Sequence, residues 1–334
     1  MISTSLITKI IRWILHGIQL QLFITLFSLP LLCAWGLPLS LLSPLGNLLF
    51  GPMLTLFLLL SSFIFLTELI GIPNGLLIML LEQVTTYWLS IMHADTKRWL
   101  IGFTQPSYFI LLLLPLSAIL VMICNQTRSL YRSSICLLLL LIGFWGYAWY
   151  LQRSTPAHIP IICNNGAVHL IQHQGTFTLI DPGYLGKTMG APSWVQFTLI
   201  PQIIQRTGCT VLDHVIVLQP NTMTLKAVES LMIKMPIKNV YIPYWHGSLS
   251  SSGLHTYSAI KKMCRDKNIL LTRISSSIQH ITLDPTCTIT IEPLPQIIQT
   301  TSISYPAFTV HTFIDNQDVT LYSAKYVEKH RDQH

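Results

Sequence analysis

The chain has 334 residues, a formal net charge of +7 and a hydrophobic content of 51%, with only 10% charged residues. Residues 1–150 contain nine Asp, Glu, Lys or Arg residues, whereas residues 151–334 contain 24. The net charge divides as +3 and +4 between these parts, which excludes the concentrated basic surface of a typical duplex-DNA-binding module.

This division of charge predicts a multi-pass membrane domain over residues 1–152 and a soluble domain over residues 153–334, because an ionised side chain costs about 3 kcal/mol in a membrane helix. Four apolar stretches approach the roughly 20 residues that cross a bilayer core. A fifth, Leu76–Met92, carries Glu82 and Gln83, so it either spans with a polar face, which we favour, or lies partly across the membrane. The four stretches are Ile18–Leu42, Gly46–Thr67, Ser107–Ile123 and Ser133–Leu151.

Basic residues predict the orientation in the inner (cytoplasmic) membrane. Lys9 and Arg12 lie in an approach helix before the first span, and no signal-cleavage pattern follows. If five segments cross, Arg128 and Arg132 lie on the same cytoplasmic side, which places the soluble domain on the outer face. With four spans, the soluble domain would be cytoplasmic.

Polar residues within the apolar part are candidates for a polar path between helices or for helix contacts, because such residues mostly face a protein interior or water. Hydrogen bonding between helices explains the two amides at least as well. A carboxylate is an odd lining for a polyanion, so we expect Glu82 to cap, pair or gate. The candidates are Asn47, Glu68, Glu82 and Gln83.

The second part alternates short β-type runs with amphipathic stretches, which predicts an α/β fold with helices packed on a sheet. Gln174-Gly175 predicts a hairpin turn, and Asp181-Pro182-Gly183 ends a strand. The predicted strands are Ile159–Cys163, Ala167–Gln172, Thr176–Asp181, Val211–Leu218, Asn239–Ile242, Ile269–Ile274, Thr286–Glu292, Phe308–Ile314 and Val319–Ser323. The predicted helices are Ser193–Arg206, Thr222–Lys234 and Leu254–Lys267.

The last predicted helix has a basic face that could contact DNA phosphates or anionic lipid headgroups. A solvated helix face is the simpler interpretation. No aromatic residues interleave with these charges in the sequence, so no base-stacking platform is expected beside them. The basic residues are Lys261, Lys262, Arg265 and Lys267.

The run Ile24-Thr-Leu-Phe-Ser-Leu-Pro30, followed by Leu45-Gly-Asn-Leu-Leu-Phe-Gly-Pro52, resembles the competence domain of the ComEC family of bacterial DNA-uptake channels. The second part resembles the metallo-β-lactamase-like domain that follows it in many members. The matching pieces are Leu179-Ile-Asp-Pro-Gly183, Leu212-Asp-His-Val-Ile-Val-Leu218 and Lys238-Asn-Val-Tyr-Ile-Pro243. The resemblance covers nearly the whole chain and rests on the order and spacing of these pieces.

The chain departs from this family where metal ligands are expected. In metal-binding members, the strand matching residues 212–218 leads into H-x-D-x-D-H or H-x-H-x-D-H, whereas this chain has Gln219-Pro-Asn-Thr-Met-Thr224. Two-metal hydrolysis needs anionic or imidazole ligands, which amide, thioether and hydroxyl groups replace poorly. We therefore expect a truncated, degenerate domain without metal, cofactor or catalytic residues. The former metal-loop positions are Gln219, Asn221, Met223, Thr224 and, where a bridging aspartate is expected, Lys325.

Histidine and cysteine spacing adds two weaker hypotheses. His169 and His173 are four residues apart, but on a strand they point to one face at a separation of nearly 14 Å, which disfavours a shared metal. Four cysteines of the soluble part could form disulfides if this domain lies outside the cell, with no pairing assigned. They are Cys163, Cys209, Cys264 and Cys287.

The resemblance implies a component of a membrane channel for uptake of single-stranded DNA in natural transformation, with a non-catalytic soluble domain. Its implied partners are single-stranded DNA, the lipid bilayer, and other competence proteins or a second channel polypeptide, with an oligomer allowed. One alternative is a membrane scaffold or binding protein derived from such a channel. A membrane-tethered metal-dependent hydrolase is the other, and the loss of the ligand loop argues against it.

Overall fold

The computed structural model describes residues 2–323 except 41, 93–98, 125–129, 155–156, 164–165, 188–189, 276, 285–286, 300–302 and 315–316. The chain divides into two compact units. One comprises Met1–Leu32, Leu39–Ile101 and Pro106–Trp145. The other comprises Cys33–Pro38, Gly102–Gln105 and Gly146–His334, so it contains two short segments of the apolar part besides the α/β part.

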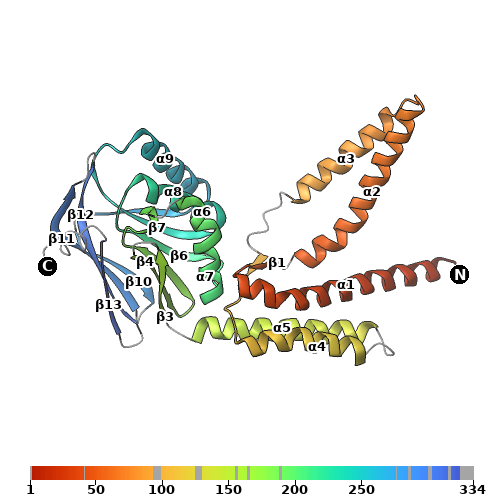
Figure 1. Ribbon diagram of the computed structural model, residues 1–334, viewed down its shortest axis with the longest axis horizontal. Helices are drawn as coiled ribbons and strands as arrows, with labels where there is room; N and C mark the ends of the chain where they lie inside the picture. The colour runs from red at the N-terminus through yellow and green to blue at the C-terminus, as the bar shows by residue number, and fades with distance from the viewer. Residues whose placement is uncertain are drawn as a thin grey trace. The chain divides into compact units, whose positions relative to one another are not determined.

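The first unit is built mainly from helices, and each of the five predicted apolar stretches lies largely within one of them. Three segments are long and apolar enough to cross a membrane, namely Ile11–Trp35, Leu49–Leu69 and Tyr131–Arg153, while the apolar helix α4 is shorter. The helices are α1 (Ile2–Trp35), α2 (Ser43–Leu69), α3 (Gly75–Met92), α4 (Tyr108–Cys124) and α5 (Leu130–Ser154) (Figure 1).

The first helix differs from its predicted bounds at both ends. α1 runs without a break from Ile2 to Trp35, so the approach segment and the first predicted span form one helix. The prediction that this span continues to Leu42 is wrong, because Gly36 adopts a φ of +63° and ends the helix. Leu39–Ser40 then forms β1, which pairs antiparallel with Leu100–Ile101 (β2).

The second unit contains a mixed six-stranded sheet with the order β3-β4-β5-β6-β7-β9. Neighbours from β3 to β5 are antiparallel, while β5, β6, β7 and β9 run parallel. Gln174-Gly175 forms the predicted hairpin turn between β4 and β5, both with positive φ. The strands are β3 (Ala157–Cys163), β4 (Gly166–His173), β5 (Thr176–Asp181), β6 (Leu212–Val217), β7 (Ile237–Pro243) and β9 (Leu270–Ile274).

Helices follow the parallel strands in the order that the sequence predicts. The helix predicted over 193–206 begins as α6 (Ala191–Trp194), passes through a π-helical turn at Val195–Leu199 and ends as α7 (Ile200–Thr207). α8 (Thr222–Lys234) has its predicted bounds, and α9 (Ser251–Asp266) begins three residues before its predicted start.

A second, antiparallel sheet has the order β10-β11-β12-β13, and β8 (His246–Gly247) adds to β12. The sequence did not predict β10, a short segment of mixed polarity that becomes a strand by pairing with β11. β11 extends well beyond the predicted Glu292. The bounds are β10 (Gln279–Asp284), β11 (Cys287–Gln299), β12 (Ile303–Ile314) and β13 (Gln317–Tyr322).

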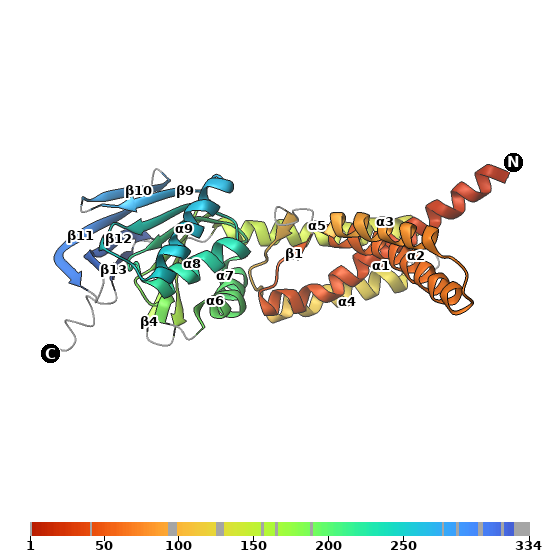
Figure 2. The same ribbon diagram turned by 90° about the horizontal axis from the view of Figure 1, so that it is seen from above.

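Two buried clusters hold these layers together. The larger one joins one face of the six-stranded sheet to the helices, with Val215 of β6 and Leu225 of α8 among its members. The smaller one joins the other face to the antiparallel sheet, through residues such as Ile216 and Phe308. Helices α6–α9 and strands β10–β13 therefore lie on opposite sides of the six-stranded sheet (Figures 1 and 2).

The short segments Cys33–Pro38 and Gly102–Gln105 of this unit contact α7 through one glutamine. The side-chain amide nitrogen of Gln205 donates to the Ala34 carbonyl at 3.0 Å and to Gln105 Oε1 at 2.8 Å. The backbone N–H of Gln105 donates in return to the Gln205 carbonyl at 2.7 Å. In two of these three bonds the segments contribute backbone groups, so that part of their attachment to α7 does not depend on their side chains.

The cysteines of the α/β part are buried and none of the four is in a disulfide, so the predicted possibility of disulfides among them is not realised. Burial, and next the negative charge of Asp181, raise the pKa of the Cys163 thiol to about 11. Burial also raises the pKa of Cys209 and Cys264. Thiols in such surroundings stay protonated at neutral pH and act as small apolar residues. The four are Cys163, Cys209, Cys264 and Cys287.

Candidate functional site at the carboxyl edge of the sheet

The carboxyl ends of β5, β6, β7 and β9 meet at one edge of the sheet, because these strands are parallel neighbours. In open α/β sheets, ligands bind outside this edge. Asp181 ends β5, Gln219 follows β6, and Tyr244, Trp245 and His246 follow β7. This edge therefore brings together positions where the resemblance implies metal ligands and an unpredicted group of aromatic side chains.

Asp181 is a turn residue, as its Asp-Pro-Gly context predicts. Its Oδ1 accepts hydrogen bonds from the backbone N–H groups of Gly183, Tyr184 and Leu185, at 2.9, 2.8 and 3.0 Å. Its Oδ2 is buried and has no hydrogen-bond partner among the residues that the structure describes. Burial raises the pKa of the Asp181 carboxyl, while the three N–H donors and then Lys187 act in the opposite direction.

The loop after β6 has structural tasks at three of its four predicted positions. Asn221 is the N-cap of α8, with its side-chain oxygen accepting from the Thr224 N–H at 2.8 Å. Gln219 is 3% exposed and packs against Gly183, where an added Cβ would lie 2.1 Å from Gln219 Oε1. Thr224 is buried against Gly186. Asn followed by helix-forming residues is an N-cap signal that sequence analysis could have found here.

These residue types do not fit a two-metal centre. Met223 is 52% exposed and Lys325 lies outside the described residues. Within the described ranges of the chain, no group of three or more His, Cys, Asp or Glu side chains could hold a metal ion.

The aromatic–arginine cluster consists of Tyr244, Trp245, Tyr257 and Arg273. The guanidinium carbon of Arg273 lies 5.7 Å from the Tyr244 ring centre and 5.4 Å from the centres of Trp245 and Tyr257. Arg273 also donates to the Tyr257 hydroxyl from Nε at 3.1 Å and from Nη2 at 2.9 Å. Tyr244 is 43% exposed, so its ring is open to a ligand.

Although no aromatic residue interleaves with the basic positions of α9 in the sequence, the structure brings three aromatic rings around Arg273. Tyr257 lies on α9, one turn before Lys261, so one ring of the cluster shares a helix with the basic side chains. Sequence reasoning missed the cluster because its members come from the end of β7, from α9 and from β9. A run of aromatic residues, Tyr244-Trp245, directly after a predicted strand was the one available signal.

Three of the four predicted contact residues on α9 are exposed without a described partner: Lys261, Lys262 and Arg265. Lys267 instead donates from Nζ to the Met232 carbonyl at 2.9 Å, near the end of α8. It thereby satisfies a carbonyl that the helix leaves open, which is a structural role.

A groove of about 480 Å³ lies next to the cluster, since His246 lines it and contacts the Tyr244 ring edge-on at 5.0 Å. Its other walls are mainly proline and aliphatic side chains of β11 and β12, including Pro293, Ile297 and Pro306. The cluster thus borders a partly apolar depression at this edge of the unit.

The structure does not bring together the four polar residues that are candidates for a polar path between the apolar helices. Asn47 donates from its side chain to Gln21 Oε1 at 3.1 Å, so it makes a contact between α2 and α1. Glu68, Glu82 and Gln83 are exposed, and no hydrogen bond or ion pair links any two of the four within the described ranges.

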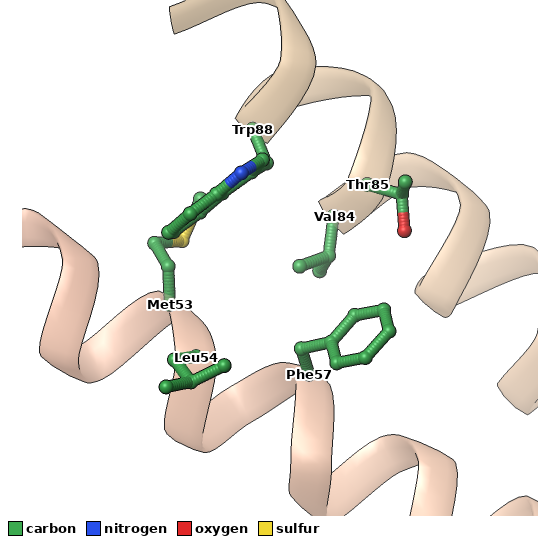
Figure 3. A pocket seen from close by; sticks show the side chains of 6 residues that line it. All are labelled: Met53, Leu54, Phe57, Val84, Thr85 and Trp88. Carbon is green, nitrogen blue, oxygen red and sulfur yellow. The ribbon is translucent and has the colours of Figure 1, made fainter. Parts of the chain in front are cut away.

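A pocket of about 190 Å³ between α2 and α3 is lined by other residues. Its walls are nearly all apolar, and Figure 3 shows the Trp88 and Phe57 side chains at its sides. Such a lining suits a lipid chain or an apolar side chain better than a polyanion. The lining residues are Met53, Leu54, Phe57, Val84, Thr85 and Trp88.

His169 pairs with His158 across the β3–β4 ladder. Nε2 of His158 lies 2.9 Å from Nδ1 of His169, and the rings stack with centres 5.1 Å apart. Burial, and next the charge of His158, lower the pKa of His169 to about 4, and burial lowers the pKa of His158. The pair is therefore neutral at pH 7.

This pair predicts a loss of stability on acidification. Because its folded pKa lies below that of the unfolded chain, His169 destabilises the fold as pH falls from about 6.5 towards about 4. After discounting for partial exposure, we expect a loss of about 1–2 kcal/mol. His169→Gln should reduce the fall in unfolding temperature between pH 7 and 4.5, whereas His255→Gln, at an exposed histidine of α9, should not. An equal fall in all three proteins would contradict this account.

The sequence matches no model of a known protein family. No curated protein matches it either.

Proposed function

We propose that this chain is a component of a membrane channel for the uptake of single-stranded DNA in natural transformation, with its α/β domain as a non-catalytic part. The proposal draws on the order along the chain of the segments that resemble the ComEC family. Three helices long and apolar enough to cross a membrane, followed by a mixed α/β domain, agree with that order.

The aromatic–arginine cluster is the observation that carries the proposal. Proteins that bind single strands combine aromatic rings, on which bases stack, with basic side chains that follow the backbone. Tyr244 offers an exposed ring beside Arg273, and α9 adds Lys261, Lys262 and Arg265. Every base has a π-face, so such a surface would accept a strand of any sequence, which suits uptake of unspecified DNA.

A non-catalytic role of the α/β domain fits the contacts of the former metal loop. Asn221 caps α8, while Gln219 and Thr224 pack against glycines of the β5 turn. In this proposal the domain lies on the outer face of the inner membrane and presents the strand to helices completed by a second channel polypeptide or by further copies of the chain.

Binding of single-stranded DNA tests the cluster directly. Fluorescein-labelled oligo-dT of 20 nucleotides is titrated onto the full chain in phosphatidylcholine nanodiscs. Tyr244→Ala should weaken binding about fivefold or more, because one stacked base contributes about 1–3 kcal/mol. The triple variant K261Q/K262Q/R265Q should lower the slope of log affinity against log salt by about 2, at roughly 0.7 per lost phosphate contact.

A tyrosine of equal exposure supplies the control. Tyr244 and Tyr322 are both 43% exposed, and Tyr322 lies on β13. Tyr322→Ala should leave binding unchanged. If Tyr244→Ala and Tyr322→Ala bind equally well, or if the full chain does not bind oligo-dT, the cluster is not a stacking platform for DNA.

Uptake in cells tests the function itself. Labelled DNA should fail to reach the cytoplasm of competent cells that lack this gene, and re-expression of the intact chain should restore it. Unchanged uptake would exclude transport and favour a membrane scaffold. Metal-dependent hydrolysis by the purified chain, abolished by a chelator, would favour a hydrolase.

A further inference from the structure

The end of α5 borders a pocket of about 350 Å³ in the second unit, at the start of β6 and β7, whereas the aromatic–arginine cluster lies beyond the end of β7. The α5-end pocket is lined by the last turns of α5, the β4–β5 turn and the start of β6. The residues that matter for its chemistry are Trp149, Arg153, Gly175, Asp213 and Lys238.

The position of this pocket on α5 places it at headgroup level. The apolar segment Tyr131–Arg153 can cross a membrane, and Arg153 is its last residue. Trp149 and Tyr150, just before it, are 50% and 64% exposed. Exposed Trp and Tyr at the end of a span lie in the membrane–water interface, and a following arginine reaches the phosphate layer.

The charges in the pocket favour one phosphodiester. Arg153 lies over the Trp149 ring, 4.2 Å from its centre, and makes no ion pair with a carboxylate within the described ranges. Lys238 Nζ lies 2.7 Å from Asp213 Oδ1, while Asp213 Oδ2 accepts from the Phe177 N–H at 2.8 Å. Both oxygens of this carboxylate are therefore engaged, and the pocket keeps a net charge of +1 from Arg153.

We propose that the α5-end pocket binds the headgroup phosphate of an anionic phospholipid, such as phosphatidylglycerol. Arg153 is the main ligand of the phosphate, with its guanidinium held by the Trp149 ring, and Lys238 supplies a second donor from the rim. A guanidinium donates two parallel hydrogen bonds to phosphate oxygens. A zwitterionic lipid also presents such oxygens, but only an anionic headgroup neutralises the net positive charge of the pocket. This site requires no DNA and stands apart from the proposed channel function.

Lipid retention by the purified full chain tests the site. The protein in detergent is titrated with phosphatidylglycerol, with phosphatidylcholine, or with soluble glycerol 3-phosphate, and bound molecules are counted by native mass spectrometry. We expect one tightly retained phosphatidylglycerol. Arg153→Gln should weaken its retention about fivefold or more, since one cation near the surface contributes about 1 kcal/mol. Arg153→Lys should recover part of it.

Lys226→Gln is the control for the loss of one positive charge, because Lys226 of α8 lies outside the pocket and outside the basic face of α9. It should retain phosphatidylglycerol like the unaltered chain. Equal retention in Arg153→Gln, or equal retention of phosphatidylcholine, would overturn the proposal. If glycerol 3-phosphate displaced the lipid at comparable concentration, the ligand of the pocket would be a soluble phosphate ester and not a lipid headgroup.

Discussion

Replacing Asp181 by alanine is expected to destabilise the α/β domain by about 3 kcal/mol or more. The change leaves three backbone N–H groups without their acceptor, those of Gly183 and Leu185, which are buried, and that of Tyr184, which is partly buried. Each unsatisfied group costs about 1–3 kcal/mol, and neighbouring losses are not fully additive. For a domain of this size the unfolding temperature should fall by about 6–12 °C, measured on the full chain in detergent.

Asp181→Asn separates the hydrogen bonds from the charge, because its side-chain oxygen can still accept from the turn. We expect it to cost at least about 2 kcal/mol less than Asp181→Ala. Asp266→Ala, at an exposed site on α9, should change stability by at most about 0.5 kcal/mol. If Asp181→Ala unfolds at the same temperature as Asp266→Ala, the turn does not depend on this carboxyl.

The effect of Asp181→Asn on stability should depend on pH. Burial raises the folded pKa of Asp181 above its unfolded value of about 3.9. The part of its contribution to stability that depends on the protonated carboxyl is thus complete below about pH 3.9 and is lost as the pH rises through the folded pKa. The free energy of unfolding of Asp181→Asn, relative to that of the unaltered protein, should therefore be higher at pH 7.5 than at pH 4.5.

Gly36→Ala is expected to destabilise the second unit by about 2–5 kcal/mol. Gly36 has a φ of +63°, and a Cβ there would lie 2.0 Å from the Pro201 carbonyl oxygen of α7. The left-handed conformation costs a non-glycine residue roughly 1–2 kcal/mol, and overpacking against the backbone adds about 1–3 kcal/mol. Thermal unfolding of the full chain, followed by size-exclusion chromatography after heating, measures the effect.

Two further glycines make this test specific. Gly102→Ala should be similarly harmful, because its Cβ would lie 2.3 Å from the Gly208 carbonyl oxygen. Gly143 lies in α5 with nothing within 4 Å of an added Cβ, so Gly143→Ala should be neutral or slightly stabilising. Equal melting of the Gly36→Ala and Gly143→Ala proteins would show that the segment at Gly36 does not pack on α7 as described.

The local elements could be predicted because their signals are local. β5 and α8 have their predicted bounds, and the Gln174-Gly175 turn forms as its residue types indicate. Burial on one face repeats along a strand or helix with a fixed period, which a single sequence displays. β10 escaped prediction because its hydrophobic pattern is weak and its hydrogen bonds come from β11.

The candidate site could be predicted only in part, because its members meet through the order of the strands. The sequence identified Lys261, Lys262 and Arg265 as possible phosphate contacts, but not Arg273 among three rings. The role of Lys267 also depended on a distant residue, the Met232 carbonyl. No local period relates the end of β7 to β9 and α9, so these contacts are invisible before the sheet is assembled.

The sequence by itself determined that apolar helices precede a charged α/β part, because hydrocarbon excludes ionised side chains and alternating burial specifies strands. Only the tertiary structure decided that Lys267 bonds the Met232 carbonyl of α8, that Gln205 joins two segments to α7, and that Arg273 lies among aromatic rings. Each of these depends on parallel neighbours in the six-stranded sheet or on close backbone approach at a glycine, and both are properties of the packed chain rather than of any one segment.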